Sequence, residues 1–114
     1  MVHYRAIFQV AESESALHEA ALRNLRNVAA DLGSDAEIAV VAHGAGIGLV
    51  TGDTGFEREV GELIKEGIEV LACQNTLTRK QISPERLLPE VRMVTSGLGE
   101  IIRRQQEGWA YVRP

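Results

Sequence analysis

Short apolar runs and longer periodic segments alternate along the whole chain. Runs that alternate or are rich in β-forming residues predict strands, and five segments have this pattern: His3 to Val10, Ala36 to Ala42, Ile68 to Cys73, Val91 to Thr95 and Trp109 to Arg113. The run from 36 to 42 (AEIAVVA) is almost unbroken, which is typical of a strand buried on both faces of a parallel sheet.

Apolar residues at spacings of three and four predict a long helix after the first strand. Its apolar stripe is Leu17, Ala21, Leu25, Val28 and Leu32. Ser13 or Ser15 can cap its start, and Gly33 can close its end.

Capping patterns predict the remaining helices. Thr54 and Glu57 match a capping box for a helix through Glu66, and Asn75 can cap a short helix that reaches about Lys80. Ser83-Pro84-Glu85 reads as a cap, a first-turn proline and a first-turn acid. Ser96 can cap a last helix. That helix is expected to direct three residues towards the sheet: Leu98, Ile101 and Ile102.

Alternating strands and helices are the pattern of stacked right-handed βαβ units. We therefore expect an α/β fold, with three α/β/α layers around a mainly parallel sheet of about five strands. The length of 114 residues suits a single domain over residues 1–114.

Composition and charge argue against nucleic-acid-binding and membrane proteins. A net charge of −4 provides no basic surface of the kind that drives nucleic-acid binding, so no nucleic-acid partner is expected. No apolar run approaches the length of a membrane span, and Met1 to Val10 lacks a signal-peptide pattern, so no membrane partner is expected either. The only cysteine excludes an internal disulfide, and together these features predict a cytoplasmic protein.

That cysteine, Cys73, stands where a functional group is expected. Ligands and catalytic groups of parallel sheets collect beyond the carboxyl ends of the strands, and Cys73 ends the third predicted strand, just before a helix. Backbone N–H groups there favour thiolate over thiol. The alternative is that Cys73 is one more small residue of the buried run that it completes.

The segment around Cys73, IEVLACQNTLTRKQI, resembles the cysteine segment of the DsrE family of small sulfur-handling proteins. In that family a strand ends in a cysteine, and a short helix, a basic residue and an apolar stretch follow; Cys73, Arg79 and Ile82 fit. The resemblance extends to VVAHG, SPERLLPEVRMV and QQEGWAYVRP, and it is greatest to stand-alone members.

The resemblance implies a DsrEFH-like fold and a sulfur-relay protein that carries a persulfide on Cys73. Such a carrier needs no cofactor or metal, because donor and acceptor proteins supply the other thiols. The resemblance also implies a homo-oligomer, a trimer or hexamer, for which Trp109 and Tyr111 are the expected interface residues.

Residues at neighbouring strand ends complete the predicted site. His43 can stabilise the thiolate as an imidazolium or transfer a proton, or it can simply hold its turn. Gly44 is expected at the pocket mouth. Gln74, Asn75 and Ser96 can donate hydrogen bonds to bound sulfur, although helix capping explains them as well.

Other functions and sites are alternatives to a sulfur carrier. A non-catalytic oligomeric binding module would use the same strand-end pocket for a small ligand or a protein. A nucleotide site would use the glycines from Gly44 to Gly48, but their G-x-G-x-G spacing does not match a phosphate-binding motif, and a tight turn is the simpler interpretation. His3 and His18 have no partners at metal-ligand spacing, so no metal is expected.

Overall fold

The computed structural model describes residues 3–114. Met1 and Val2, the first two residues of the stretch Met1 to Val10 that lacks a signal-peptide pattern, lie outside the described residues. The elements in chain order are β1 (Tyr4–Val10), α1 (Ser15–Leu32), β2 (Ala36–Ala42), α2 (Gly48–Thr51), α3 (Glu57–Lys65), β3 (Glu69–Cys73), α4 (Gln74–Arg79), β4 (Arg92–Val94), α5 (Gly97–Gln106) and β5 (Ala110–Val112). Short 3₁₀ helices cover Gly33–Asp35, Gly44–Ile47 and Pro84–Arg86. Among the described residues, no helix combines the length and the apolar character needed to cross a membrane.

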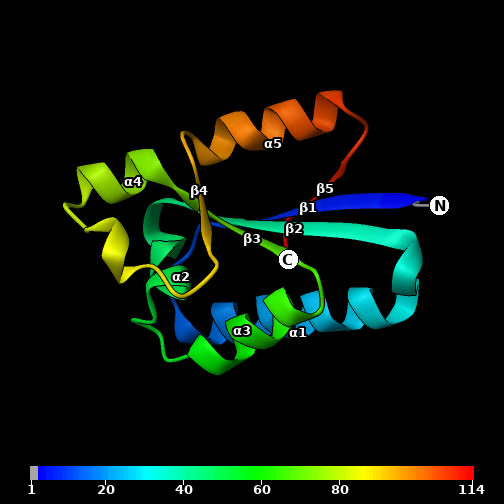
Figure 1. The fold of residues 1–114 in the computed structure, drawn as a ribbon, viewed down its shortest axis with the longest axis horizontal. Coiled ribbons are helices and arrows are strands. Elements are labelled where there is room, and N and C mark those ends of the chain that lie inside the picture. Colours follow the sequence, from blue (N-terminus) through cyan, green and yellow to red (C-terminus); the bar gives the residue numbers. More distant parts are fainter. Residues whose placement is uncertain (1–2) are drawn as a thin grey trace.

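The five strands form one parallel sheet in the order β4-β3-β2-β1-β5. Helices α1 and α3 cover one face of the sheet and α5 covers the other, so the molecule has three layers (Figure 1). The predicted α/β fold with a five-stranded parallel sheet is therefore confirmed. β2 lies at the centre, which explains its unbroken apolar sequence.

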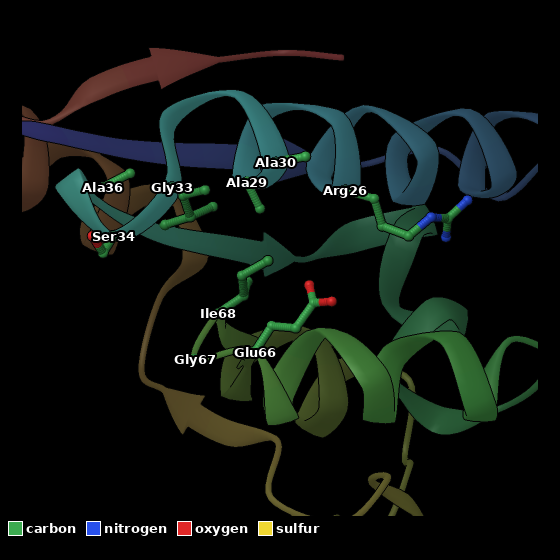
Figure 2. A pocket seen from close by; sticks show the side chains of 10 residues that line it. Arg26, Ala29, Ala30, Gly33, Ser34, Ala36, Glu66, Gly67 and Ile68 are labelled. Atoms are coloured by element: carbon green, nitrogen blue, oxygen red, sulfur yellow. The ribbon is translucent and has the colours of Figure 1, made fainter.

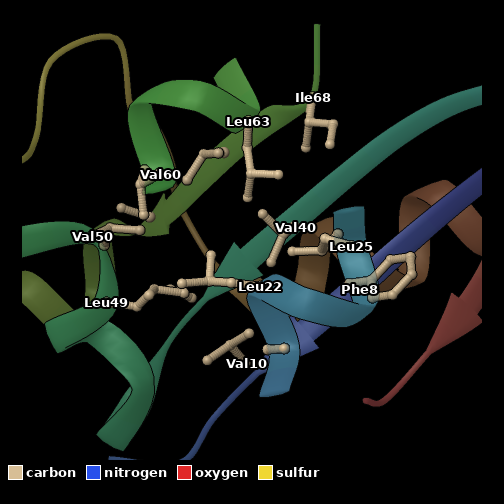
Figure 3. Packing of buried hydrophobic residues seen from close by; sticks show 14 of the residues in the cluster. Phe8, Val10, Leu22, Leu25, Val40, Leu49, Val50, Val60, Leu63 and Ile68 are labelled. Atoms are coloured by element: carbon tan, nitrogen blue, oxygen red, sulfur yellow. The ribbon is translucent and has the colours of Figure 1, made fainter. Parts of the chain in front are cut away.

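Two apolar clusters fill the space between the layers. The larger one joins the sheet to α1, α2 and α3, and Figure 3 shows Phe8 and Val40 of the sheet beside Leu22, Leu25 and Leu63 of the helices. The smaller one lies beneath α5 and consists of Ile7, Ala39, Val41, Leu71, Ile101 and Trp109. Because side chains alternate along a strand, Gln9, His43 and Cys73 also belong to the α5 side of the sheet.

The apolar stripe of α1 differs from the prediction by part of a turn. Leu17 is exposed, whereas His18 and Leu22 are buried together with the predicted Ala21 and Leu25. Neither serine side chain caps this helix, whose N-cap is Glu14, but Gly33 closes it with a φ of 61°, as predicted.

Two other predicted caps are wrong. Helix α3 begins after Phe56, and the hydroxyl of Thr54 instead contacts Nδ1 of the buried His18, 3.3 Å away. Helix α4 begins at Gln74, so that Asn75 lies inside it and Cys73 itself is the N-cap residue. The predictions for Ser83 and Ser96 are confirmed, since both side chains accept a hydrogen bond from a backbone N–H of the following helix.

The packing of α5 also differs from the prediction. Ile101 is buried, but Leu98 and Ile102 are 54% and 60% exposed. Their expected place against the sheet is taken by Arg104 and Trp109, which are both buried, with the guanidinium 4.5 Å from the indole centroid. Trp109 is thus part of the chain's own core and is not the interface residue that we predicted.

Candidate functional site

Cys73 lies at the carboxyl end of β3, where the strand passes directly into α4. The residue is 6% exposed and its thiol is free. The strand end positions it beside the loop between β4 and α5, because Asn75 N–H donates to the carbonyl of Thr95 in that loop. The thiol is therefore enclosed by α4 on one side and by the start of α5 on the other.

Hydrogen-bond donors near Cys73 change the pKa of its thiol. Burial raises the pKa of this thiol, but the Thr76 hydroxyl and the backbone N–H groups of Gly97, Thr76 and Asn75 lower it by more. The net effect is a pKa below the ordinary value for cysteine. These donors favour the thiolate, which is the nucleophilic form.

Thr76 was not recognised from the sequence, although its hydroxyl lowers the pKa of the Cys73 thiol. Thr76 is 3% exposed, and its hydroxyl oxygen accepts a hydrogen bond of 2.9 Å from the N–H of Gly44. A hydroxyl that accepts from Gly44 keeps its own proton available for the sulfur. Gly44 therefore belongs to the site through its backbone. The sequence did contain a signal for this role of Thr76: a hydroxyl residue three positions after a strand-end cysteine lies in the first turn of the following helix.

Gly97 is the second residue that sequence reasoning missed. Its N–H lowers the pKa of the Cys73 thiol, and a Cβ on Gly97 would lie 3.0 Å from Cβ of His43 and 3.2 Å from Cγ2 of Val41. Only glycine lets the start of α5 approach the strand ends this closely. Ser96 holds that start in place, since its hydroxyl accepts from Gly99 N–H at 3.0 Å.

Gln74 and Asn75 are both exposed. The backbone N–H of Asn75, not its side-chain amide, contributes to the lowered pKa of the Cys73 thiol. Ser96 acts as a helix cap. Of the predicted pocket residues, Gly44 donates to Thr76, Asn75 affects the thiol of Cys73 through its backbone N–H, and Ser96 caps α5.

His43 follows β2 on the same side of the sheet as Cys73, and its ring contacts Gln9, with 2.7 Å between Nε2 of His43 and Nε2 of the amide. Burial lowers the pKa of His43, while the charge of Glu12 raises it and that of Arg113 lowers it further. The net direction is downward, which favours a neutral ring. A neutral ring adds no charge beside the thiolate, and a role of His43 in the site stays a prediction.

The glycine-rich segment after β2 is helical and not an open loop. Gly46 N–H donates to the carbonyl of His43, and Gly44 N–H donates to Thr76. A Cβ on Gly46 would lie 2.3 Å from the carbonyl oxygen of Val10, so this glycine serves close packing against β1. With these N–H groups used inside the protein, the segment does not resemble a phosphate cradle.

A groove of about 390 Å³ opens near the amino ends of β2 and β3, at the other end of the strands from Cys73 and between the ends of α1 and α3. Figure 2 shows Arg26, Gly33, Glu66 and Ile68 along it. None of the predicted site residues lines this groove. Within residues 3–114, no group of three His, Cys, Asp or Glu side chains is placed to hold a metal ion.

Comparison with known proteins identifies the family of the chain. The chain is similar to MTH1491 of Methanobacterium thermoautotrophicum, a protein of unknown function, with 39% identity over 98% of this chain and 100% of that one and a TM-score of 0.93. It shares its fold with BT1422 of Bacteroides thetaiotaomicron, also of unknown function, at 16% identity and a TM-score of 0.70, over 96% and 94% of the two chains. No curated protein matches the chain. The sequence model of the DsrE/DsrF-like family matches residues 5–114, and the chain therefore belongs to that family.

Proposed function

We propose that this protein is a sulfur carrier that accepts sulfane sulfur on Cys73 and passes it to an acceptor thiol. The observation that supports the proposal is the set of donors around the sulfur, from Thr76, Gly97 and Asn75, which lowers the pKa of a thiol that burial alone would raise. A cysteine that served only to fill the core would need no such donors.

The transfer step requires one thiolate and no redox cofactor. The Cys73 thiolate attacks the outer sulfur of a donor persulfide, R–S–SH, and a bond forms between the two sulfur atoms. The bond between R–S and the outer sulfur breaks at the same time, and its electron pair leaves with R–S⁻, which takes a proton from solvent. The product is a persulfide on Cys73. Attack by an acceptor thiolate on the outer sulfur of Cys73 repeats the exchange and regenerates the Cys73 thiolate.

Release of sulfur distinguishes a carrier from a cysteine that is merely modified. The chain is loaded with a persulfide-bearing sulfurtransferase, separated from it and mixed with glutathione. We expect the extra sulfur to leave Cys73 and to appear as glutathione persulfide. Loaded protein that keeps its sulfur under these conditions would contradict a carrier role and favour the non-catalytic binding module.

A persulfide carrier needs a reducing compartment, because oxidation would consume its only thiol. We therefore propose a cytoplasmic location. The partners in this proposal are a protein that donates sulfane sulfur and a second protein that accepts it.

Self-association forms part of the same proposal. Leu98 and Ile102 lie one helical turn apart on the outer side of α5, and both are more than half exposed, as is Tyr4. Burial of such apolar side chains between copies is a common basis of homo-oligomers. Tyr111, at 41% exposure, stays available to an interface, whereas Trp109 does not.

We expect light scattering at micromolar concentration to give the mass of a trimer or hexamer. Replacing both Leu98 and Ile102 by lysine is expected to shift the mass towards the monomer, because charges on an apolar contact surface oppose burial. Lysine at Leu17, which is also exposed but lies on α1, is the matched control. A monomeric wild-type protein would contradict the expectation.

A further inference from the structure

A chain of hydrogen bonds leads from β5 across β1 to His43. The Tyr111 hydroxyl donates to Oε1 of Gln9, and the amide nitrogen of Gln9 contacts Nε2 of His43 at 2.7 Å. Tyr111 pairs with Ile7 in the register of β1 and β5, so its ring lies on the same side of the sheet as Gln9. We infer that Tyr111 and Gln9 are positioning residues, which hold the His43 ring neutral with its proton on Nδ1.

The orientation of the Gln9 amide carries this inference. A glutamine amide has one accepting end and one donating end. Since Tyr111 donates to the oxygen, the NH₂ group is the end that faces His43. Nε2 of His43 must then accept, which requires a lone pair on that nitrogen and leaves the ring proton on Nδ1.

Protonation of His43 opposes this arrangement. An imidazolium carries a proton on Nε2, and that proton would point at the N–H of Gln9, so the two donors would have to separate. The charged groups nearest the ring come from two segments, Glu12 after β1 and Arg113 after β5, and these two side chains form an ion pair with each other. Their opposite effects on the ring partly cancel, and burial of the ring then favours the neutral form.

His43 also contacts the site itself. Its Cβ and Cγ lie 3.0 and 3.3 Å from the position that a Cβ of Gly97 would occupy, and the N–H of Gly97 is one of the donors to Cys73. β2 and β3 are paired at Ala42 and Ala72, so His43 and Cys73 are the next residues of adjacent strands. A fixed ring therefore supports the backbone segment that stabilises the thiolate, and no imidazolium charge is added beside it.

The consequence for sulfur transfer rests on the proposed function. If the ring stays neutral, the pH dependence of transfer follows the Cys73 thiol alone, without a second group that titrates near the ordinary histidine pKa of about 6.5. The tautomer itself can be measured without any sulfur chemistry. The two inferences can therefore fail separately.

Nuclear magnetic resonance of the ring nitrogens in ¹⁵N-histidine-labelled protein tests the tautomer directly. In the wild type we expect His43 to be neutral and protonated on Nδ1, with a pKa below the ordinary value. In Tyr111→Phe the amide of Gln9 loses its anchor, and we expect an Nε2-protonated population and a higher pKa. Tyr4→Phe removes the hydroxyl of the other tyrosine, which lies at the opposite end of β1, and is expected to change neither.

A second variant reverses the polarity of the contact. In Gln9→Glu a carboxylate faces Nε2 and accepts a hydrogen bond from the protonated nitrogen, so we expect the pKa of His43 to rise above its ordinary value. The pH profile of Cys73 alkylation should then gain a second titration. A wild-type ring protonated on Nε2, or a tautomer that Tyr111→Phe leaves unchanged, would overturn the inference. Failure of sulfur loading with the expected tautomer would count against the proposed function alone.

Discussion

Replacing Cys73 by serine is expected to abolish sulfur loading completely. Treated with a sulfurtransferase that carries sulfane sulfur, the wild-type chain should gain the mass of one sulfur atom, and Cys73→Ser should gain none. The sequence contains one cysteine, so a loss cannot be compensated elsewhere in the chain. Intact-protein mass spectrometry before and after incubation measures the difference.

Folding of the Cys73→Ser variant is the necessary control. The donors around the sulfur can equally well meet a serine hydroxyl, so we expect a stability loss of only about 1 kcal/mol, near the centre of the range for single substitutions. Unfolding by urea, followed by circular dichroism, checks this value. A folded Cys73→Ser variant that still gains sulfur would show that the cysteine is not the acceptor.

The largest loss of stability is expected from Arg104→Ala. The Arg104 side chain is 11% exposed and pairs with Glu69 at 3.1 Å and with Glu100 at 2.7 Å. Its guanidinium also covers Trp109, so the variant loses packing as well as charge. Two carboxylates that are mostly shielded from water would remain without it. We expect a loss of about 2 to 3 kcal/mol in the free energy of unfolding, measured in urea at pH 7.

Arg103 provides a matched control on the same helix. It also pairs with Glu100, but its side chain is 61% exposed, so Arg103→Ala should cost less than about 1 kcal/mol. Equal losses in the two variants would contradict the assignment of Arg104 as the buried partner.

The same cluster gives a pH dependence. Burial raises the pKa of Glu100, but Arg104 and Arg103 lower it by more, so its folded pKa lies below the unfolded one. Its contribution is fully present above the unfolded value, about 4.3, and is lost as the pH falls through the folded value. We expect the difference between wild type and Arg104→Ala to shrink as the pH falls below the unfolded value and through the folded pKa of Glu100.

The sheet could be predicted because each strand has a local signal. The unbroken run ending at Ala42 predicts a strand buried on both faces of a parallel sheet, and the alternating tail from Trp109 to Arg113 predicts a further strand. Cys73 could be placed at a strand end for the same reason. These features depend on the order of residues in one segment and not on distant contacts.

The wrong predictions concern features that depend on contacts between residues far apart in the sequence. Threonine is a common helix N-cap residue, but the hydroxyl of Thr54 contacts the buried His18 of α1 instead. Trp109 reads as an exposed aromatic until Arg104 of α5 is placed over it. Thr76 and Gly97 meet at Cys73 only because α4 and α5 begin at adjacent strand ends, and the strand order does not follow from the sequence pattern.

The central claim is that Cys73 is a reactive thiolate in the native fold, and its rate of alkylation by iodoacetamide as a function of pH tests this most directly. We expect modification without denaturant and a midpoint below about 8.5, the ordinary thiol pKa. Thr76→Val should raise the midpoint, because it removes the hydroxyl donor, whereas Thr78→Val, at an exposed position of the same helix, should not. Modification only after denaturation, or a midpoint at or above the ordinary value, would contradict the account.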